Sequence, residues 1–189
     1  KGATQLVLPD NKDIVLFAVT VVKEENPQVS PASGLFRTAL KPQQGDKANA
    51  PKVNLMKGAK VIACSGFVNE EESPECMIDG DTQTKWCDIT GVPNYADFDL
   101  GETKNVSGWK LVNAGQESHS YVTRTCFLQG KNSLSEEWKT LGRLDDNRKN
   151  EVTGLLTKPE SVRYIRLLIA QPSQDTGSRD ARIYELEVY

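Results

Sequence analysis

The chain has 189 residues, a formal net charge of −3 and a hydrophobic fraction of 38%. This length supports one hydrophobic core with some chain left over. The acidic balance argues against nucleic acid as a partner, because phosphate binding needs a basic stripe. No apolar run approaches the length that crosses a bilayer, and no basic amphipathic segment suits a membrane surface, so we expect no membrane partner either.

The first 22 residues predict two strands, 5–8 and 14–22, separated by a turn at 9–13. The second strand is nearly all apolar, which is typical of a strand buried on both faces. Two strands cannot form such a core alone, so the segment either joins the main domain or closes a preceding β domain. We favour the second alternative. Because the chain begins at Lys1, we expect it to be a piece of a longer protein.

Residues 23–52 are dominated by Lys, Glu, Pro, Gln, Ser and Gly, a composition that predicts a linker. From residue 53 onward, short apolar stretches alternate with turns, and no helical periodicity appears between them. This pattern predicts an antiparallel β-sandwich over residues 53–189. The predicted strands are 60–65, 96–101, 106–112, 122–129, 138–144, 163–169 and 183–189.

The last predicted strand alternates between apolar and acidic side chains. Its period of two places Tyr184, Leu186 and Val188 on one face. Glu185 and Glu187 point to the other face.

The loop 76–87 is polar, rich in turn residues and ends near Trp86. In Asp79-Gly80-Asp81 the glycine supplies positive φ, and the aspartates accept bonds from nearby backbone amides. The same side chains are hard oxygen donors, so such a loop can hold calcium. Two interpretations stay open: a metal-stiffened loop pinned to the core by Trp86, or a metal-free turn in which Asp79 caps backbone amides.

Cysteines occur at positions 64, 76, 87 and 126. None forms a CxxC pair and the chain has one histidine, so we do not expect a structural zinc site. Four cysteines permit three disulfide pairings. Cys76 and Cys87 bracket the loop and either form a disulfide across it or remain buried free thiols.

Several short motifs follow one another along the chain: Asp79-Gly-Asp-x-x-Thr-x-Trp86, Asp97-Phe-Asp-Leu-Gly101, Trp138, Arg163-Tyr-Ile-Arg166 and Ala181-Arg-Ile-Tyr-Glu-Leu-Glu-Val-Tyr189. Their order and spacing resemble the coagulation factor V/VIII type C, or discoidin-like, domain, and within it the family 32 carbohydrate-binding modules. The resemblance covers roughly residues 53–189. It implies an all-β fold, an eight-stranded galactose-binding-like jelly-roll β-sandwich, here with an N-terminal β-hairpin and linker.

The resemblance also implies a calcium ion, or sodium in its place. Six residues would supply side-chain or carbonyl oxygens to it: Cys76, Asp79, Asp81, Thr84, Tyr184 and Glu185. The carboxylates in this set are those of Asp79 and Glu185, and the other donors are neutral oxygens. A set of this kind suits calcium better than magnesium, which demands a tighter octahedron.

Sugar sites of the resembled modules form from loops at one end of the sandwich, which points to the loop 113–124. Hydrogen bonds to sugar hydroxyls and one aromatic ring face are the interactions expected there. The loop 171–180 either forms a second wall of this sugar site or is a plain connection between strands. The alternative for the loop 113–124 is a solvated surface loop that binds nothing. The candidate carbohydrate-binding residues are Glu117, His119, Tyr121, Arg124, Asp175 and Arg179.

The remaining large aromatic residues suit packing better than sugar stacking. We expect Trp86, Trp109, Trp138 and Tyr95 in the core or at its edge. This leaves few aromatic side chains for a sugar.

We expect no catalytic residues in this chain. Glycoside hydrolysis needs two carboxyl groups facing each other in a cleft, whereas the carboxylate runs 70–72, 136–137 and 145–146 are typical of solvated faces. No nucleophile elbow, zinc-protease motif or phosphate loop is present in the sequence.

Residues 6–20 resemble the last strands of the C-terminal region of family 38 glycoside hydrolases, the α-mannosidases. The two resemblances together predict a non-catalytic carbohydrate-binding module at the C-terminus of a bacterial α-mannosidase that is periplasmic or secreted. Its partners would be a glycan and the catalytic domain of the same polypeptide. The alternative hypothesis is a structural or protein-docking β-sandwich that binds no sugar.

Overall fold

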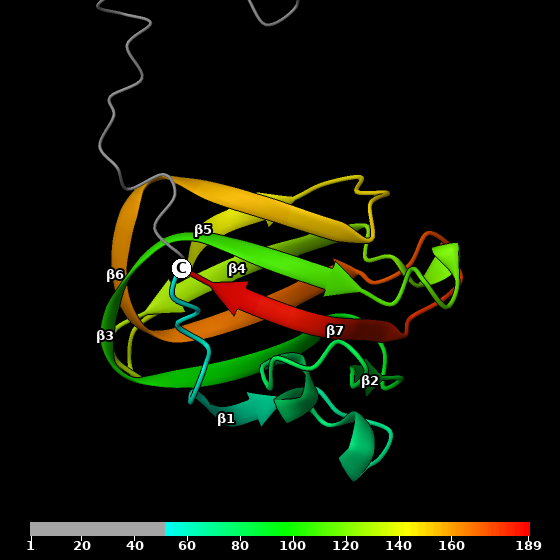
Figure 1. Cartoon of the computed structure of the whole chain (residues 1–189), viewed down its shortest axis with the longest axis horizontal. Helices are drawn as coiled ribbons and strands as arrows, with labels where there is room; N and C mark the ends of the chain where they lie inside the picture. Colours follow the sequence, from blue (N-terminus) through cyan, green and yellow to red (C-terminus); the bar gives the residue numbers. More distant parts are fainter. Residues whose placement is uncertain (1–51) are drawn as a thin grey trace, which may run out of the picture. The chain divides into compact units, whose positions relative to one another are not determined.

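Seven strands and three short 3₁₀ helices make up residues 52–189, the part of the chain that the computed structural model describes (Figure 1). The strands are β1 (Lys60–Cys64), β2 (Trp86–Asp88), β3 (Asn94–Asn113), β4 (Thr125–Lys131), β5 (Lys139–Leu144), β6 (Glu151–Gln171) and β7 (Ala181–Val188). The helices are η1 (Glu70–Glu72), η2 (Pro74–Met77) and η3 (His119–Tyr121). Every strand pairing is antiparallel, which confirms the predicted fold class.

The predicted N-terminal hairpin (1–22) and all but the last residue of the linker (23–52) lie outside the described residues. Within the described part, no helix is long and apolar enough to span a membrane.

Two long strands, β3 and β6, pair with each other along most of their length and bend around one side of the molecule (Figure 1). The sheet order is β2-β7-β3-β6-β4-β5, with β1 also paired to β3. The first half of β3 pairs with β1 and its second half with β7, so one strand takes part in both layers of the sandwich. Register shifts after Asp99 and after Val106 mark the bend in β3.

The observed strands differ from the predicted ones in several places. The segments 96–101 and 106–112 were expected as two strands but form one, β3, and the short strand β2 was not predicted, so the described residues contain seven strands where the resemblance implied eight. β6 begins at Glu151, well before the predicted start at Arg163. β4 begins at Thr125 instead of Val122.

β7 lies between β2 and β3, and it carries a bulge at Tyr184. Glu185 pairs with Val112 and Ile183 pairs with Asn113, so Tyr184 has no partner in β3. The extra residue interrupts the alternation of faces: Ile183, Leu186 and Val188 are buried in the core. The prediction that Tyr184 shares a face with Leu186 and Val188 was therefore wrong, and Glu185 is buried beside the turn.

The core between the layers contains apolar side chains from nearly every strand. Trp86 and Trp109 are fully buried, as predicted. The indole Nε1 of Trp86 donates to the carbonyl of Gly66 (2.9 Å). The Trp109 indole occupies space left by Gly142 of β5 and Gly154 of β6, where an added Cβ would collide with it.

Trp138 and Tyr95, in contrast, are only half-buried. The guanidinium of Arg166 lies 4.5 Å from the ring centroid of Trp138 and 4.6 Å from that of Tyr95. Asp97 accepts two hydrogen bonds from Arg166, at 2.6 and 2.7 Å. Arg166 thus lies between the two rings and is held there by Asp97, and neither ring is part of the buried core cluster.

Asp88 at the end of β2 is a fully buried carboxylate with several donors around it. It accepts hydrogen bonds from the Ser65 hydroxyl, from the amide and hydroxyl of Thr90 (2.8 and 2.7 Å) and from the Asn94 side chain (3.0 Å). Burial alone raises the pKa of Asp88, but these hydrogen bonds outweigh burial and hold the pKa below its ordinary value. The carboxylate therefore remains charged and joins the residue that follows β1, the loop that follows β2 and the first residue of β3.

The four cysteines at positions 64, 76, 87 and 126 are free thiols. Cys76 and Cys87 therefore form no disulfide across the loop 76–87. Burial raises the pKa of Cys126 to about 12, so this thiol stays protonated.

Candidate functional site

The turn after η2 is built by the aspartates and glycine that the sequence places there. The Asp79 carboxylate accepts from the Asp81 amide (2.7 Å), and the Asp81 carboxylate accepts from the Gln83 amide (2.9 Å). Gly80 has a φ of +84°, in the left-handed region that favours glycine. The backbone caps expected of Asp79 are therefore present.

The hydroxyl of Thr84 gathers three oxygens of this turn. It lies 2.8 Å from a carboxylate oxygen of Asp79, 3.0 Å from the carbonyl of Asp81 and 3.4 Å from the carbonyl of Cys76. The turn thus concentrates oxygen atoms of one carboxylate, two carbonyls and one hydroxyl at a single point.

Glu185 of β7 brings a second carboxylate against the turn and is only 3% exposed. One oxygen accepts from the Gly80 amide (3.2 Å), while the other is buried with no hydrogen-bond partner among the described residues. Burial raises the pKa of Glu185 to about 7; the Gly80 amide opposes this shift, and the charge of Asp79 adds to it. A half-satisfied buried carboxylate beside another carboxylate is an environment that a cation would stabilise.

These donors fit a hard cation. Cys76, Asp79, Asp81 and Thr84 lie together in the turn, Glu185 lies against it, and Tyr184 is the bulged residue beside Glu185. In residues 52–189, no three Cys, His, Asp or Glu side chains gather at one point. The set has two carboxylates, and its other members offer neutral oxygens, which calcium accepts and zinc does not favour.

A second candidate region is the end of the sandwich where several strands begin or finish. Thr125 pairs with Gln171, Cys126 with Leu144, and Asn94 with Ile169. Asn113, the last residue of β3, pairs with Ile183 of β7. The loops 89–93, 114–124, 145–150 and 172–180 connect these strand ends, and we call this end of the sandwich the loop end.

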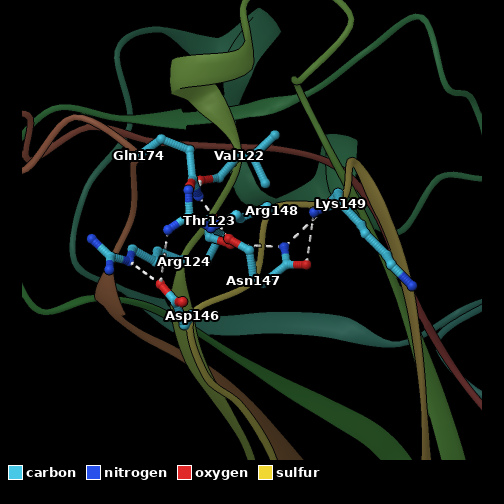
Figure 2. Close-up of polar contacts among 8 residues, drawn as sticks. All are labelled: Val122, Thr123, Arg124, Asp146, Asn147, Arg148, Lys149 and Gln174. Carbon is cyan, nitrogen blue, oxygen red and sulfur yellow. Dashed lines mark hydrogen bonds and ion pairs between the residues drawn. The ribbon is translucent and has the colours of Figure 1, made fainter.

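Two side-chain amides join three of these loops, as Figure 2 shows. Gln174 donates to the carbonyls of Val122 (3.0 Å) and Asn147 (2.7 Å). Asn147, which is 7% exposed, donates to the carbonyls of Thr123 (2.9 Å) and Lys149 (2.9 Å). These bonds satisfy buried carbonyls and fix the loops relative to one another.

The predicted sugar ligand Glu117 is engaged with residues near the turn. Its carboxylate accepts from the Tyr184 hydroxyl (2.7 Å) and forms an ion pair with Lys85 (3.0 Å). Partial burial raises the pKa of Glu117, but the hydrogen bonds from Tyr184 and Lys85 prevail and lower it. Glu117 thus links the loop 114–124 to the chain just before β2.

The other three candidates of this loop differ in their surroundings. His119 is exposed on η3. The guanidinium of Arg182 lies 4.1 Å from the ring centroid of Tyr121 and covers one face of that ring. Arg124 donates to Asp146 (2.7 Å), whose φ of 43° is unusual for a residue other than glycine (Figure 2).

The candidates Asp175 and Arg179 lie on the neighbouring loop 172–180. Ser173 and Gln174 of that loop both donate to the carbonyl of Ser120, at 2.5 and 3.0 Å, so the structure brings the two candidate loops together. Asp175 is exposed and accepts from the Gly177 amide (2.9 Å).

Arg179 lines a groove of about 360 Å³ between the start of β4, the end of β6 and the loops 89–93 and 172–180. A second hollow, of about 290 Å³, lies over β3 and β7 beside Thr82 and Gln83 of the turn, and Lys110 and Glu187 are among its lining residues. The groove is part of the loop end, whereas the second hollow adjoins the turn.

Sequence reasoning missed Asn147 and Gln174, which hold the loop end together. Each is a single amide in a polar loop, and nothing in its spacing distinguishes it from a solvated residue. Nothing in the sequence predicted the positive φ of Asp146, the residue before Asn147.

The fold and these two regions define an antiparallel β-sandwich with a turn tied to its last strand and a cluster of fixed loops at one end. The model of the F5/8 type C domain matches residues 61–186. The chain belongs to this family. None of the curated proteins matches it.

Solved structures with the same fold include the family 32 carbohydrate-binding module of Streptococcus pneumoniae EndoD (TM-score 0.64, 23% identity, 72% of this chain and 99% of that chain). Another is chitosan-binding module 2 of a Paenibacillus sp. IK-5 chitosanase/glucanase, in complex with chitotriose (0.59, 20%, 72% and 99%). A third is a Ruminococcus gnavus GH29 fucosidase in complex with fucose (0.62, 23%, 76% and 28%). The predicted likeness to family 32 modules is confirmed at the level of the fold.

Proposed function

We propose that the domain is a non-catalytic carbohydrate-binding module and that its loop end holds the sugar. The observation that carries this proposal is the set of loops fixed by Asn147 and Gln174 beside a groove of about 360 Å³. Preformed concave sites with a few fixed polar groups are typical of small-ligand binding. The solved structures of the same fold include a family 32 carbohydrate-binding module and a chitosan-binding module with chitotriose, which supports this function.

We propose calcium as the ion of the turn, held by the six residues predicted from the sequence. The unpartnered oxygen of Glu185 and the oxygens gathered at Thr84 support this assignment. Calcium would neutralise the carboxylates of Asp79 and Glu185 and so stabilise the connection between the turn and β7. Its role would be structural.

Titration calorimetry of the chain with galactose, N-acetylglucosamine, mannose and chitotriose tests the sugar-binding function. Binding of any of these, lost on replacement of Asn147 by Ala, supports the loop end as the site. Flat titrations throughout would count against a carbohydrate-binding module. A protein whose melting temperature does not respond to calcium would count against the ion but leave the sugar proposal standing.

A further proposal concerns the larger protein that contains this domain. We propose that the domain is attached to a glycoside hydrolase, because the fold also occurs within a fucosidase chain. A location outside the cytoplasm is part of the same proposal. Tethering would raise the concentration of glycan near the enzyme even at weak affinity. The assignment to an α-mannosidase depends on residues 6–20, and the sequence preceding Lys1 would test it directly.

One observation favours the docking alternative. Phe67, Val68 and Ile89 are exposed, and the Val68 amide donates to the carbonyl of Cys87, so their loops are neighbours. A small exposed apolar patch of this kind suits contact with another protein domain. Polar replacement of Phe67 and Ile89 that alters activity of the parent enzyme without changing sugar binding would support it.

A further inference from the structure

The groove at the loop end has two chemically different sides. Val92, Ala170 and Pro172 provide apolar surface, while Thr125, Thr176 and Ser178 carry hydroxyl groups. A pyranose has the same division, because its C–H groups are apolar and its hydroxyls hydrogen-bond. The volume of about 360 Å³ falls within the range of small-ligand sites.

Arg179 is the charged residue among those that line this groove. Other arginines nearby are paired: Arg124 with Asp146 and Arg182 with Asp180. Within the described part of the chain, the Arg179 side chain has neither an ion pair nor a hydrogen bond. Its donors are therefore available to a ligand.

The loop 89–93 leaves room for the Arg179 side chain. Gly91 has a φ of +114°, and the Cδ and Nη1 atoms of Arg179 lie 4.0 Å from the position that a Cβ of Gly91 would occupy. The arginine therefore extends past a residue without a side chain, and its guanidinium stays at the groove.

We propose that this groove binds an anionic sugar unit, one with a carboxylate or sulfate group that Arg179 recognises. The inference depends on the proposed carbohydrate-binding function and adds the class of sugar. A guanidinium presents two parallel N–H donors that match two oxygens of either anion, and it is always charged. The apolar side of the groove would contact the ring, and its hydroxyl groups would bond the sugar hydroxyls.

The experiment is calorimetric titration of the chain with glucuronate, galacturonate and glucose 6-sulfate, compared with glucose and galactose. Free calcium and ionic strength are held equal in all titrations, since uronates also bind calcium. We expect the anionic sugars to bind at least about tenfold more tightly than the neutral ones, from one charge-assisted contact. Added salt should reduce this preference.

Three variants test whether Arg179 causes the preference for anionic sugars. Arg179→Gln should abolish the preference for anionic over neutral sugars, and Arg179→Lys should keep only part of it because the planar fork is lost. Arg148→Gln is the matched control: Arg148 is an exposed arginine of the loop 145–150 that does not line the groove. This control should retain the full preference.

Each outcome decides a separate question. Tight binding of uronates alone or of the sulfate alone identifies the recognised anion, and both results support the inference. Equal affinity for neutral and anionic sugars would overturn the inference and leave the proposed function intact. A preference that survives Arg179→Gln, or is lost equally in Arg148→Gln, would overturn the role of Arg179. Binding of no sugar at all would overturn the proposed function itself.

Discussion

The carboxylate of Glu185 accepts a hydrogen bond from the amide of Gly80, although 105 residues separate the two in the chain. This contact attaches the last strand to the turn between η2 and β2. The other oxygen of Glu185 is buried and unpartnered among the described residues, so the contact satisfies only half of the group. A buried carboxylate in this condition costs free energy unless a cation compensates it.

Replacing Glu185 by Gln should therefore reverse the order of stability between calcium and a chelator. In the chelator, Glu185→Gln should be at least as stable as the wild type, because the uncompensated charge is gone. In calcium at a hundred times the dissociation constant, the wild type should gain about 2.7 kcal/mol. The variant should gain much less, and thermal unfolding in both conditions measures the difference.

Asp81→Asn is the matched control for that experiment. It removes a charge from the same turn, but Asn can still accept from the Gln83 amide, and the Asp81 carbonyl remains. We expect it to keep most of the response to calcium. Equal losses in the two variants would indicate a general electrostatic effect and contradict a specific ligand role for Glu185.

Stability at low pH should depend on Asp88. Its pKa is lowered in the folded state, so its contribution is fully present above the unfolded value of about 3.9 and is lost as the pH falls through the lower folded-state value. Asp88→Asn should be roughly 2–4 kcal/mol less stable than the wild type at pH 6, because charged hydrogen bonds are lost. Urea unfolding of both proteins at pH 6 and near pH 3 should show this difference shrinking in acid, and a constant difference would contradict the prediction.

Replacing Asn147 by Ala should loosen the loop end. The carbonyls of Thr123 and Lys149 would lose a buried donor, at a cost of roughly 1–3 kcal/mol. Amides of the loops 114–124 and 145–150 should exchange with deuterium faster, while those of β3 and β6 keep their protection. Arg148→Ala at the neighbouring exposed position should leave exchange unchanged, and equal exchange in the two variants would argue against the network.

Gly154→Ala should destabilise the domain by roughly 1–3 kcal/mol, because the added methyl group would collide with the Trp109 indole. The neighbouring change Leu155→Ala serves as the control, since Leu155 is 75% exposed. Denaturant unfolding, followed by tryptophan fluorescence, would report the effect. A Gly154→Ala variant as stable as the wild type would show that the indole can move.

The sequence was sufficient to predict most strands and the oxygen-rich turn, since alternating apolar residues and Asp-Gly-Asp are local signals. It was insufficient for the first part of β6, where Lys158 and Pro159 are exposed and conceal a strand. It also could not reveal the bulge at Tyr184, because a bulge depends on the register with β3 rather than on composition.

The candidate sugar site was also predicted only in part. The sequence identified two loops, and the structure brings them together through Ser120 and Ser173. It did not reveal that Glu117 and Arg124 are engaged by partners, because Lys85 and Asp146 are distant in the chain. Long-range pairing of charged side chains has no signature in a single sequence.

The position of β7 between β2 and β3 has a consequence for synthesis on the ribosome. Residues up to 180 can be translated while the neighbouring edges of β2 and β3 still lack the strand that separates them. The hydrophobic interior cannot close until residues 181–188 emerge, so the nascent domain exposes unpaired backbone until almost its last residue. Ribosome-bound chains truncated before residue 181 should therefore be digested readily by protease, whereas chains extended beyond residue 189 should resist.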